Sequence, residues 1–141
     1  MKYAKWVFTL TLVALPILAV AQMASSTRIE GQVPFPFMVG TNHVPAGKCE
    51  IELAGAGGRT LAIHNVSGNV GLFTAASPNL SKKASESYAL VFHKYGDRAF
   101  LTSIKLAGDR TVYQIPESRA EAELRAQNAT ATEEVLLASA K

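Results

Sequence analysis

Apolar and polar residues alternate with a period of two along most of residues 28–115. This period places successive side chains on opposite faces of a β-strand. Turn-forming segments rich in Gly, Asn and Pro interrupt the alternation, for example "VGTNHVPAG" and "AGAGGR". Short strands with regular turn signals are typical of an all-β fold, here an antiparallel sandwich or small barrel of about seven strands. The strands are expected at 28–39, 47–53, 60–65, 69–75, 88–95, 99–106 and 111–115.

A C-terminal helix is expected after the last strand. Pro116 ends that strand, and "SRAE" at 118–121 has the form of a capping box, in which the Ser and Glu side chains satisfy free amides at a helix start. Strong helix formers then continue to Asn128. A thin apolar stripe would dock this helix on the sheet, and its members are Ala120, Leu124 and Gln127.

The N-terminus has the three parts of a cleaved secretory signal peptide. Two lysines precede an apolar run at 6–20, and Ala19-Val20-Ala21 forms an Ala-x-Ala cleavage site. The run is shorter than the roughly 20 residues of a membrane-spanning helix. We therefore expect residues 1–21 to be removed and the mature protein to be secreted or periplasmic. An uncleaved membrane anchor is the alternative.

Cleavage would leave one domain with little net charge. A short linker (22–27) would lead into a β-rich domain with its C-terminal helix (28–128) and a flexible tail (129–141). In this tail "VLL" at 135–137 predicts at most a helical turn, with a partner-binding helix as the alternative. The signal contains two of the 14 basic residues, so 12 remain against 11 acidic ones. This balance predicts no nucleic-acid partner, and no membrane span is expected after cleavage.

Cys49 is the single cysteine of the chain, so it has no intrachain disulfide partner. In "GKCEIEL" it alternates with Lys48 and Glu50 and shares the apolar face with Ile51 and Leu53. We expect a buried, unreactive thiol, because no nearby base or helix start would lower its pKa.

The segment "VFHKYGDRAFL" (91–101) raises the question of a catalytic group, because His93, Asp97 and Arg98 lie close together. A turn explains them better. "YGDR" at 95–98 recurs as "AGDR" at 107–110, and Gly-Asp supports the positive φ angles of tight hairpins. No serine or cysteine nucleophile stands beside His93, so a catalytic His93–Asp97 pair is not expected.

Other candidate sites are equally unconvincing as sequence. His43, His64 and His93 are spaced like no local metal motif. Glu50 and Glu52 share a strand face with Lys48, as on an ordinary solvated surface. "GAGG" at 55–58 lacks the lysine and helix of a phosphate loop. We therefore expect no catalytic, cofactor-binding or metal-binding residues, and no cofactor.

Three features leave their role open. The serine-rich segment 77–87 is either a mobile surface loop or a lid. The triplets at Asn65, Asn79 and Asn128 would matter only where Asn-x-Ser/Thr is glycosylated, and we assign them no role. Aromatic side chains could line a ligand pocket inside a small barrel, although core packing is their default role. They are Phe35, Phe37, Tyr88, Phe92, Tyr95, Phe100 and Tyr113.

Several short motifs resemble a group of small, secreted, uncharacterised bacterial proteins that are frequent in acidobacteria-like genomes. These are "VPFPFMVG", "VPAG", "ALVFHKYGDRAFLTSI" and "IPESRAEAEL", which together span most of residues 29–124. The chain departs from the group at Cys49 and Ala99, where aromatic residues would be expected. The resemblance implies export and a β-rich fold, and it implies no activity. The residues that carry it are Pro34, Phe35, Phe37, Val39, Gly40, Pro45, Ala46, Gly47, Leu90, Val91, Phe92, Tyr95, Gly96, Asp97, Phe100, Leu101, Pro116, Ser118 and Glu121.

Taken together, the sequence favours an exported, non-enzymatic β-domain that binds an unknown protein or small ligand. Two alternatives stay open. One is a secreted hydrolase-like enzyme that uses His93 or His64 with a carboxylate. The other is a structural subunit that assembles through exposed strand edges. The sequence does not specify an oligomeric state.

Overall fold

The computed structural model describes residues 26–127 and 129–141. The expected signal peptide (1–21), most of the linker and Asn128 lie outside this range. Nothing helical in the described part of the chain has the length and apolar character needed to cross a membrane.

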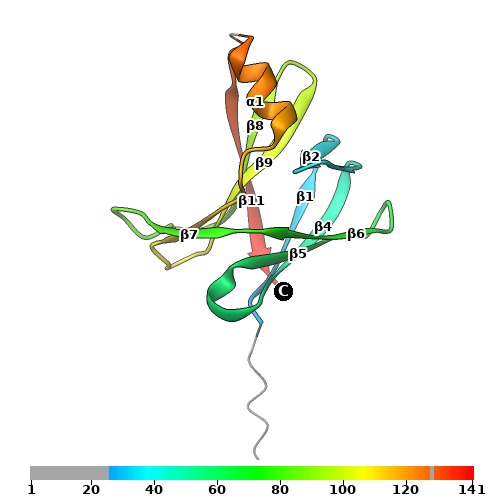
Figure 1. Ribbon diagram of the computed structural model, residues 1–141. Helices are drawn as coiled ribbons and strands as arrows, with labels where there is room; N and C mark the ends of the chain where they lie inside the picture. The colour runs from blue at the N-terminus through cyan, green and yellow to red at the C-terminus, as the bar shows by residue number, and fades with distance from the viewer. Residues whose placement is uncertain (1–25, 128) are drawn as a thin grey trace, which may run out of the picture.

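The described residues are mostly strand, with one α-helix and one short 3-10 helix, and they form a nearly closed barrel (Figure 1). The expected all-β class is confirmed, but the number of strands is eleven rather than seven. The elements are β1 (Arg28–Val33), β2 (Phe37–Val39), β3 (Asn42–Val44), β4 (Gly47–Ala54), η1 (Ala56–Gly58), β5 (Thr60–Asn65), β6 (Val70–Ala75), β7 (Ser77–Leu80), β8 (Tyr88–Tyr95), β9 (Arg98–Lys105), β10 (Thr111–Gln114), α1 (Arg119–Ala126) and β11 (Thr132–Ala140).

The strands follow one path around the barrel, in the order β3-β2-β9-β8-β11-β1-β4-β5-β6. Pairing is antiparallel except between β2 and β9, so the sheet is mixed. β6 and β7 run on as one extended segment across the front of Figure 1, with buried Ala76 between them. β6 pairs with β5 and β7 pairs with β10, which in turn pairs with β9. This segment therefore links β5, near one end of the strand path, to β9 by way of β10.

Two of the strands that were not expected are β2 and β7. β2 arises where prolines divide an expected strand, and β7 lies in a segment expected to be a loop. The expected strand 28–39 is divided into β1 and β2 because Pro34 and Pro36 have no amide hydrogen to donate to a ladder. The serine-rich segment begins with β7, so part of it is strand rather than loop. The remainder is held by backbone hydrogen bonds to the second Gly-Asp-Arg turn, from Ser81 N to Arg110 O (2.8 Å) and from Ser85 N to Asp109 O (2.9 Å).

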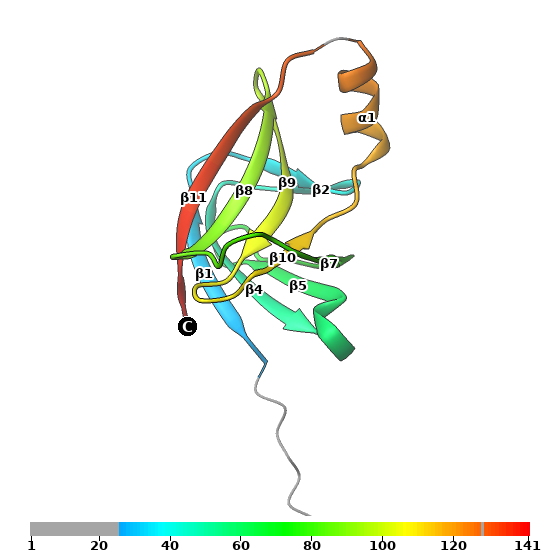
Figure 2. The same ribbon diagram turned by 90° about the vertical axis from the view of Figure 1, so that its left-hand side faces the viewer.

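The largest correction concerns the tail. Residues 129–141 were expected to be flexible, with a possible helical turn at 135–137, but Thr132–Ala140 forms β11. This strand lies between β8 and β1, with Leu136 opposite Leu90 and Ala140 opposite Ile29. The last strand of the chain thus connects the two halves of the barrel (Figure 2).

The barrel interior is filled by the alternating apolar side chains. The Phe92 ring is fully buried and makes edge-to-face contacts with Phe35 and Phe37, each at a centroid distance of 5.2 Å. Cys49 is also fully buried, as expected, and burial raises the pKa of its thiol. The rings of Phe35, Phe37 and Phe92 therefore pack against one another in the core rather than lining a pocket.

The first Gly-Asp-Arg turn and the start of the helix are as predicted from the sequence. Tyr95 pairs with Arg98 across a two-residue turn in which Gly96 has a φ of 61°, as tight hairpins require. Ser118 caps α1, where its Oγ accepts a hydrogen bond from Glu121 N at 3.1 Å. Ala120 and Leu124 are half-buried, whereas Gln127 is exposed and does not belong to the docking face.

Candidate functional site

The helix α1 forms one side of a concave surface on the barrel. Glu121 of α1 contacts His93 and Tyr95, which alternate along β8 with the core residues Leu90 and Phe92 (Figure 1). The helix therefore packs on the outer face of the barrel wall. Between them is a groove of about 510 Å³. Its lining consists of Val91, His93, Tyr95, Thr102, Ser103, Gln114, Ile115, Glu117, Glu121, Arg125, Ala129, Ala131 and Glu133.

A hydrogen-bonded cluster forms the floor of this groove. Glu121 Oε1 lies 3.0 Å from Nδ1 of His93 and accepts a hydrogen bond from the Tyr95 hydroxyl at 3.3 Å. His93 and Tyr95 share one face of β8 because they are two residues apart. The Glu121 side chain is 6% exposed, whereas that of His93 is 38% exposed. The carboxylate is thus held inside the cluster and the imidazole is open to the groove.

The sequence drew attention to His93 but predicted no site there, and it considered Asp97 rather than Glu121 as the neighbouring carboxylate. Asp97 lies in the exposed hairpin turn, and the carboxylate beside the imidazole belongs to Glu121 instead. Glu121 is the Glu of the capping box, whose side chain usually bonds to the amide of the capping residue. Here it points to the sheet and is the single buried side chain of α1. A buried polar residue on the docking face was the signal that could have revealed it.

Carboxylates outnumber basic groups along the groove. Glu117 is paired with Arg125, whose Nη2 lies 2.9 Å from Glu117 Oε2. Glu133 is exposed and lies directly opposite His93 in the β11–β8 pairing. Three lining residues are glutamates (Glu117, Glu121 and Glu133), against one arginine. The groove therefore favours a ligand group that is cationic or donates hydrogen bonds.

An apolar strip continues from the groove along β11. Val91 lines the groove and lies opposite Val135, and Ala89 lies opposite Leu137 on the same face. Val135 and Leu137 are 47% and 72% exposed. We call the exposed side chains of Val135 and Leu137, together with the buried Ala89 and Val91 beside them, the β11 strip. A polar groove that opens onto exposed apolar side chains suits an amphipathic molecule.

A nucleophile beside the imidazole is not provided by the strand pairing. Ser103 lines the groove but lies opposite Val91, while Phe100 lies opposite His93. The Thr102 hydroxyl donates a hydrogen bond to the carbonyl oxygen of Val91 at 3.0 Å. The arrangement can bind and orient a polar group, and His93 can exchange a proton with it.

The other sites considered from sequence are separate from this groove. His43, His64 and His93 lie on β3, β5 and β8. Within residues 26–127 and 129–141, no group of three or more His, Cys, Asp or Glu side chains is arranged to hold a metal ion. Glu50 is paired with Lys141 and Glu52 with Arg28 on the outer face of β4. These contacts lower the pKa of the Glu50 carboxyl, as Ser26 and Arg28 do for Glu52.

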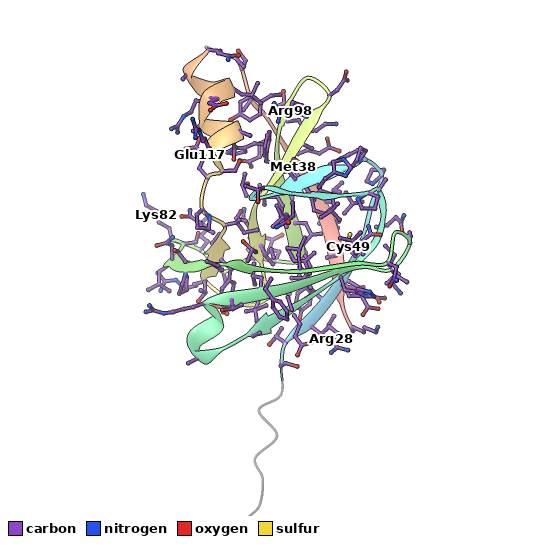
Figure 3. All side chains as sticks on the ribbon, turned by 45° about the vertical axis from the view of Figure 1, so that its right-hand side comes forward. Arg28, Met38, Cys49, Lys82, Arg98 and Glu117 are labelled. Carbon is purple, nitrogen blue, oxygen red and sulfur yellow. The ribbon has the colours of Figure 1, made fainter. Side chains whose placement is uncertain are left out.

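A second hollow of about 320 Å³ lies on the outer face of β4, β5 and β6. It is lined by Arg28, Glu50, Glu52, Ala62, Ile63, His64, Gly71, Leu72 and Phe73. Figure 3 shows Glu117 beside the start of α1 and Arg28 near the opposite end of the molecule. The two concave surfaces are therefore well separated.

The contact between Tyr95 and Glu121 predicts a specific effect of alkaline pH. Burial, together with the negative charge of Glu121, raises the pKa of the Tyr95 phenol. A pKa that is higher in the folded than in the unfolded chain contributes stability that is lost as the pH rises from the ordinary tyrosine value of about 10 through the folded value. The free energy of unfolding should therefore fall over this window.

Glu121→Gln keeps the shape of the side chain and removes its charge, so it should lower the pKa of Tyr95. The measurement is an NMR titration of tyrosine labelled with ¹³C at Cζ. Tyr113 is the internal control, because burial and Asp109 raise the pKa of its phenol. An unchanged Tyr95 titration in Glu121→Gln would show that the carboxylate does not act on the phenol.

Comparison of the chain with protein-family models, with curated proteins and with solved structures gives no match.

Proposed function

We propose that this protein is a binding protein for a small amphipathic molecule that carries an amine. The observation that supports this most strongly is the continuity of two surfaces: a glutamate-rich groove at His93 and the apolar β11 strip beside it. An ammonium group would interact with Glu133 at the open side of the groove. The hydrocarbon part would cover Val135 and Leu137 and remove them from water.

The test uses octylamine as a probe, with octanoate as a control of equal length and opposite charge. Titration of ¹⁵N-labelled protein should give saturable shift changes at His93 and along β11 with octylamine and much weaker ones with octanoate. Butylamine lacks four methylenes and should bind roughly tenfold or more weakly, because each buried methylene contributes up to about 0.8 kcal/mol.

A matched pair of variants tests whether the carboxylate of Glu133 binds the ammonium group. Glu133→Gln should weaken octylamine binding roughly tenfold, since a hydrogen bond to a charged group contributes about 1.5 kcal/mol or more. Glu123→Gln is the control, because Glu123 is paired with Arg119 on the exposed side of α1. Equal binding of octanoate and octylamine, or equal effects of the two variants, would contradict the proposal.

The rival function is a hydrolase-like enzyme, and the contact between His93 Nδ1 and Glu121 is the observation that favours it. It predicts that His93→Ala retains its fold and loses turnover of a substrate that wild-type protein converts. If His93→Ala changes only octylamine binding and no wild-type turnover is found with ester or amide substrates, the enzymatic proposal fails.

Export remains part of the proposal. The segment 1–21 has the form of a signal peptide, and the motif resemblance is to secreted bacterial proteins. The ligand would then be met in the periplasm or outside the cell. The mass of protein exported by a bacterial host checks this, since cleavage would leave a chain that begins at Gln22.

A further inference from the structure

The strand β6 has one hydrogen-bonding edge without a partner in the described sheet. Residues Val70–Ala75 pair with β5 on one side, and β6 ends the strand path. Its sequence, VGLFTA, contains no charged residue and no proline. Charged residues and prolines are the features with which proteins usually protect a free edge, and β6 lacks both. β3, at the other end of the path, has only three residues, and β7 contains Pro78.

The outer face of β6 carries a protruding ring and an empty space two residues apart. Phe73 is 75% exposed. Gly71 lies on the same face, and a Cβ built on it would meet a single neighbouring atom, Cδ2 of His64, at 3.8 Å. The backbone does not require glycine there, because Gly71 is not among the residues with positive φ. The space over Gly71 belongs to the hollow of about 320 Å³ described above.

We propose that two copies of this chain associate by antiparallel pairing of β6 with β6. With Leu72 on the twofold axis, Gly71 of one copy lies opposite Phe73 of the other, and the same contact recurs on the other side of the axis. An aromatic ring opposite a glycine covers the backbone that the glycine leaves exposed. Each phenyl ring would enter the space over Gly71 of the other copy.

A second copy fits this edge because one strand carries both halves of the contact. β6 is uncharged, so two copies meet without repulsion between like charges. The nearest carboxylates of the hollow, Glu50 and Glu52, are already paired with Lys141 and Arg28. In Figure 3, Arg28 of this hollow and Glu117 of the groove beside α1 lie near opposite ends of the molecule, so we expect the association not to depend on ligand binding in the groove.

The first test is sedimentation velocity of the exported chain over a range of micromolar concentrations. Wild-type protein should show a concentration-dependent monomer–dimer equilibrium. Phe73→Ser should raise the dissociation constant roughly a hundredfold, because two aromatic contacts are lost. Leu80→Ser is the control, since Leu80 is 78% exposed but lies outside β6. A wild-type monomer at every concentration, or equal effects of the two variants, would overturn the proposal.

A second test reports the register even if Phe73→Ser alters more than the interface. Gly71→Cys protein and Phe73→Cys protein are oxidised separately and as a mixture. The mixture should form a covalent dimer, and each variant alone should not, because the two positions face each other only across copies. Cys49 is fully buried and does not compete. Cross-linking of Phe73→Cys alone, or no cross-linking in the mixture, would exclude the proposed register.

Discussion

Removal of residues 132–141 is expected to prevent the chain from folding. β11 pairs with β8 from Thr132 to Ala138, and its end pairs with β1 at Ala140. Without β11, the edges of β8 and β1 that pair with it lose their hydrogen bonds. Leu90 and Ile29, which are now buried, would then face water. This loss exceeds the net stability of a typical domain, about 5–15 kcal/mol. Circular dichroism and amide NMR dispersion of the truncated chain are the measurements.

Deletion of Lys141 alone is the control. It removes the contact with Glu50 and the bond from Lys141 N to Arg28 O (3.0 Å) but leaves β11 in place, so this variant should fold. A synthetic peptide of residues 132–141 should restore the fold of the truncated chain. A truncated chain with a native spectrum would mean that the segment is a dispensable tail.

The second large effect is expected for Asn65→Leu. Asn65 is fully buried at the end of β5, where its Nδ2 donates to the carbonyl oxygen of Pro45 at 2.7 Å and to Sγ of Cys49 at 3.4 Å. Its Oδ1 accepts a hydrogen bond from Gly68 N at 2.6 Å. Leucine leaves the groups at Pro45 and Gly68 without partners, which should cost about 2–4 kcal/mol of unfolding free energy.

Asn79→Leu is the matched control, because Asn79 also begins an Asn-x-Ser triplet. It is exposed, and its Nδ2 donates to Oε1 of Gln114 at 2.7 Å. Its replacement should change the unfolding free energy by no more than about 0.5 kcal/mol. Urea unfolding of the two variants makes the comparison. Equal destabilisation would show that the hydrogen bonds of Asn65 to Pro45 and Gly68 do not stabilise the fold.

The strands with one buried and one solvated face could be predicted from the sequence. The alternation at 60–65 reproduces β5, which presents an apolar face to the core. The expected strand 88–95 is also found, as β8, although most of its side chains are buried on both faces. β11 could not be recognised in this way. Its segment TEEVLLASA is rich in good helix formers, and exposed Val135 and Leu137 obscure the alternation. Pairing with β8, distant in the sequence, determines its structure.

The candidate site was predictable only in part. The turn at 95–98 and the cap at Ser118 follow from local residue chemistry, and both are confirmed. The contact between His93 and Glu121 joins residues 28 positions apart, on a strand and a helix. The spacing of residues along the sequence does not predict this contact, because the contact depends on where α1 docks on the sheet. A buried glutamate on the docking face replaces the apolar residue that a surface helix normally places there.

The position of bound octylamine tests the proposed groove most directly. Intermolecular NOEs between the octyl chain and protein methyl groups report that position. The proposal predicts NOEs to the methyl groups of Val135 and Leu137, together with shift changes at His93. NOEs to Leu90 and Ile104, which are buried inside the barrel, would place the ligand in the interior and contradict the account.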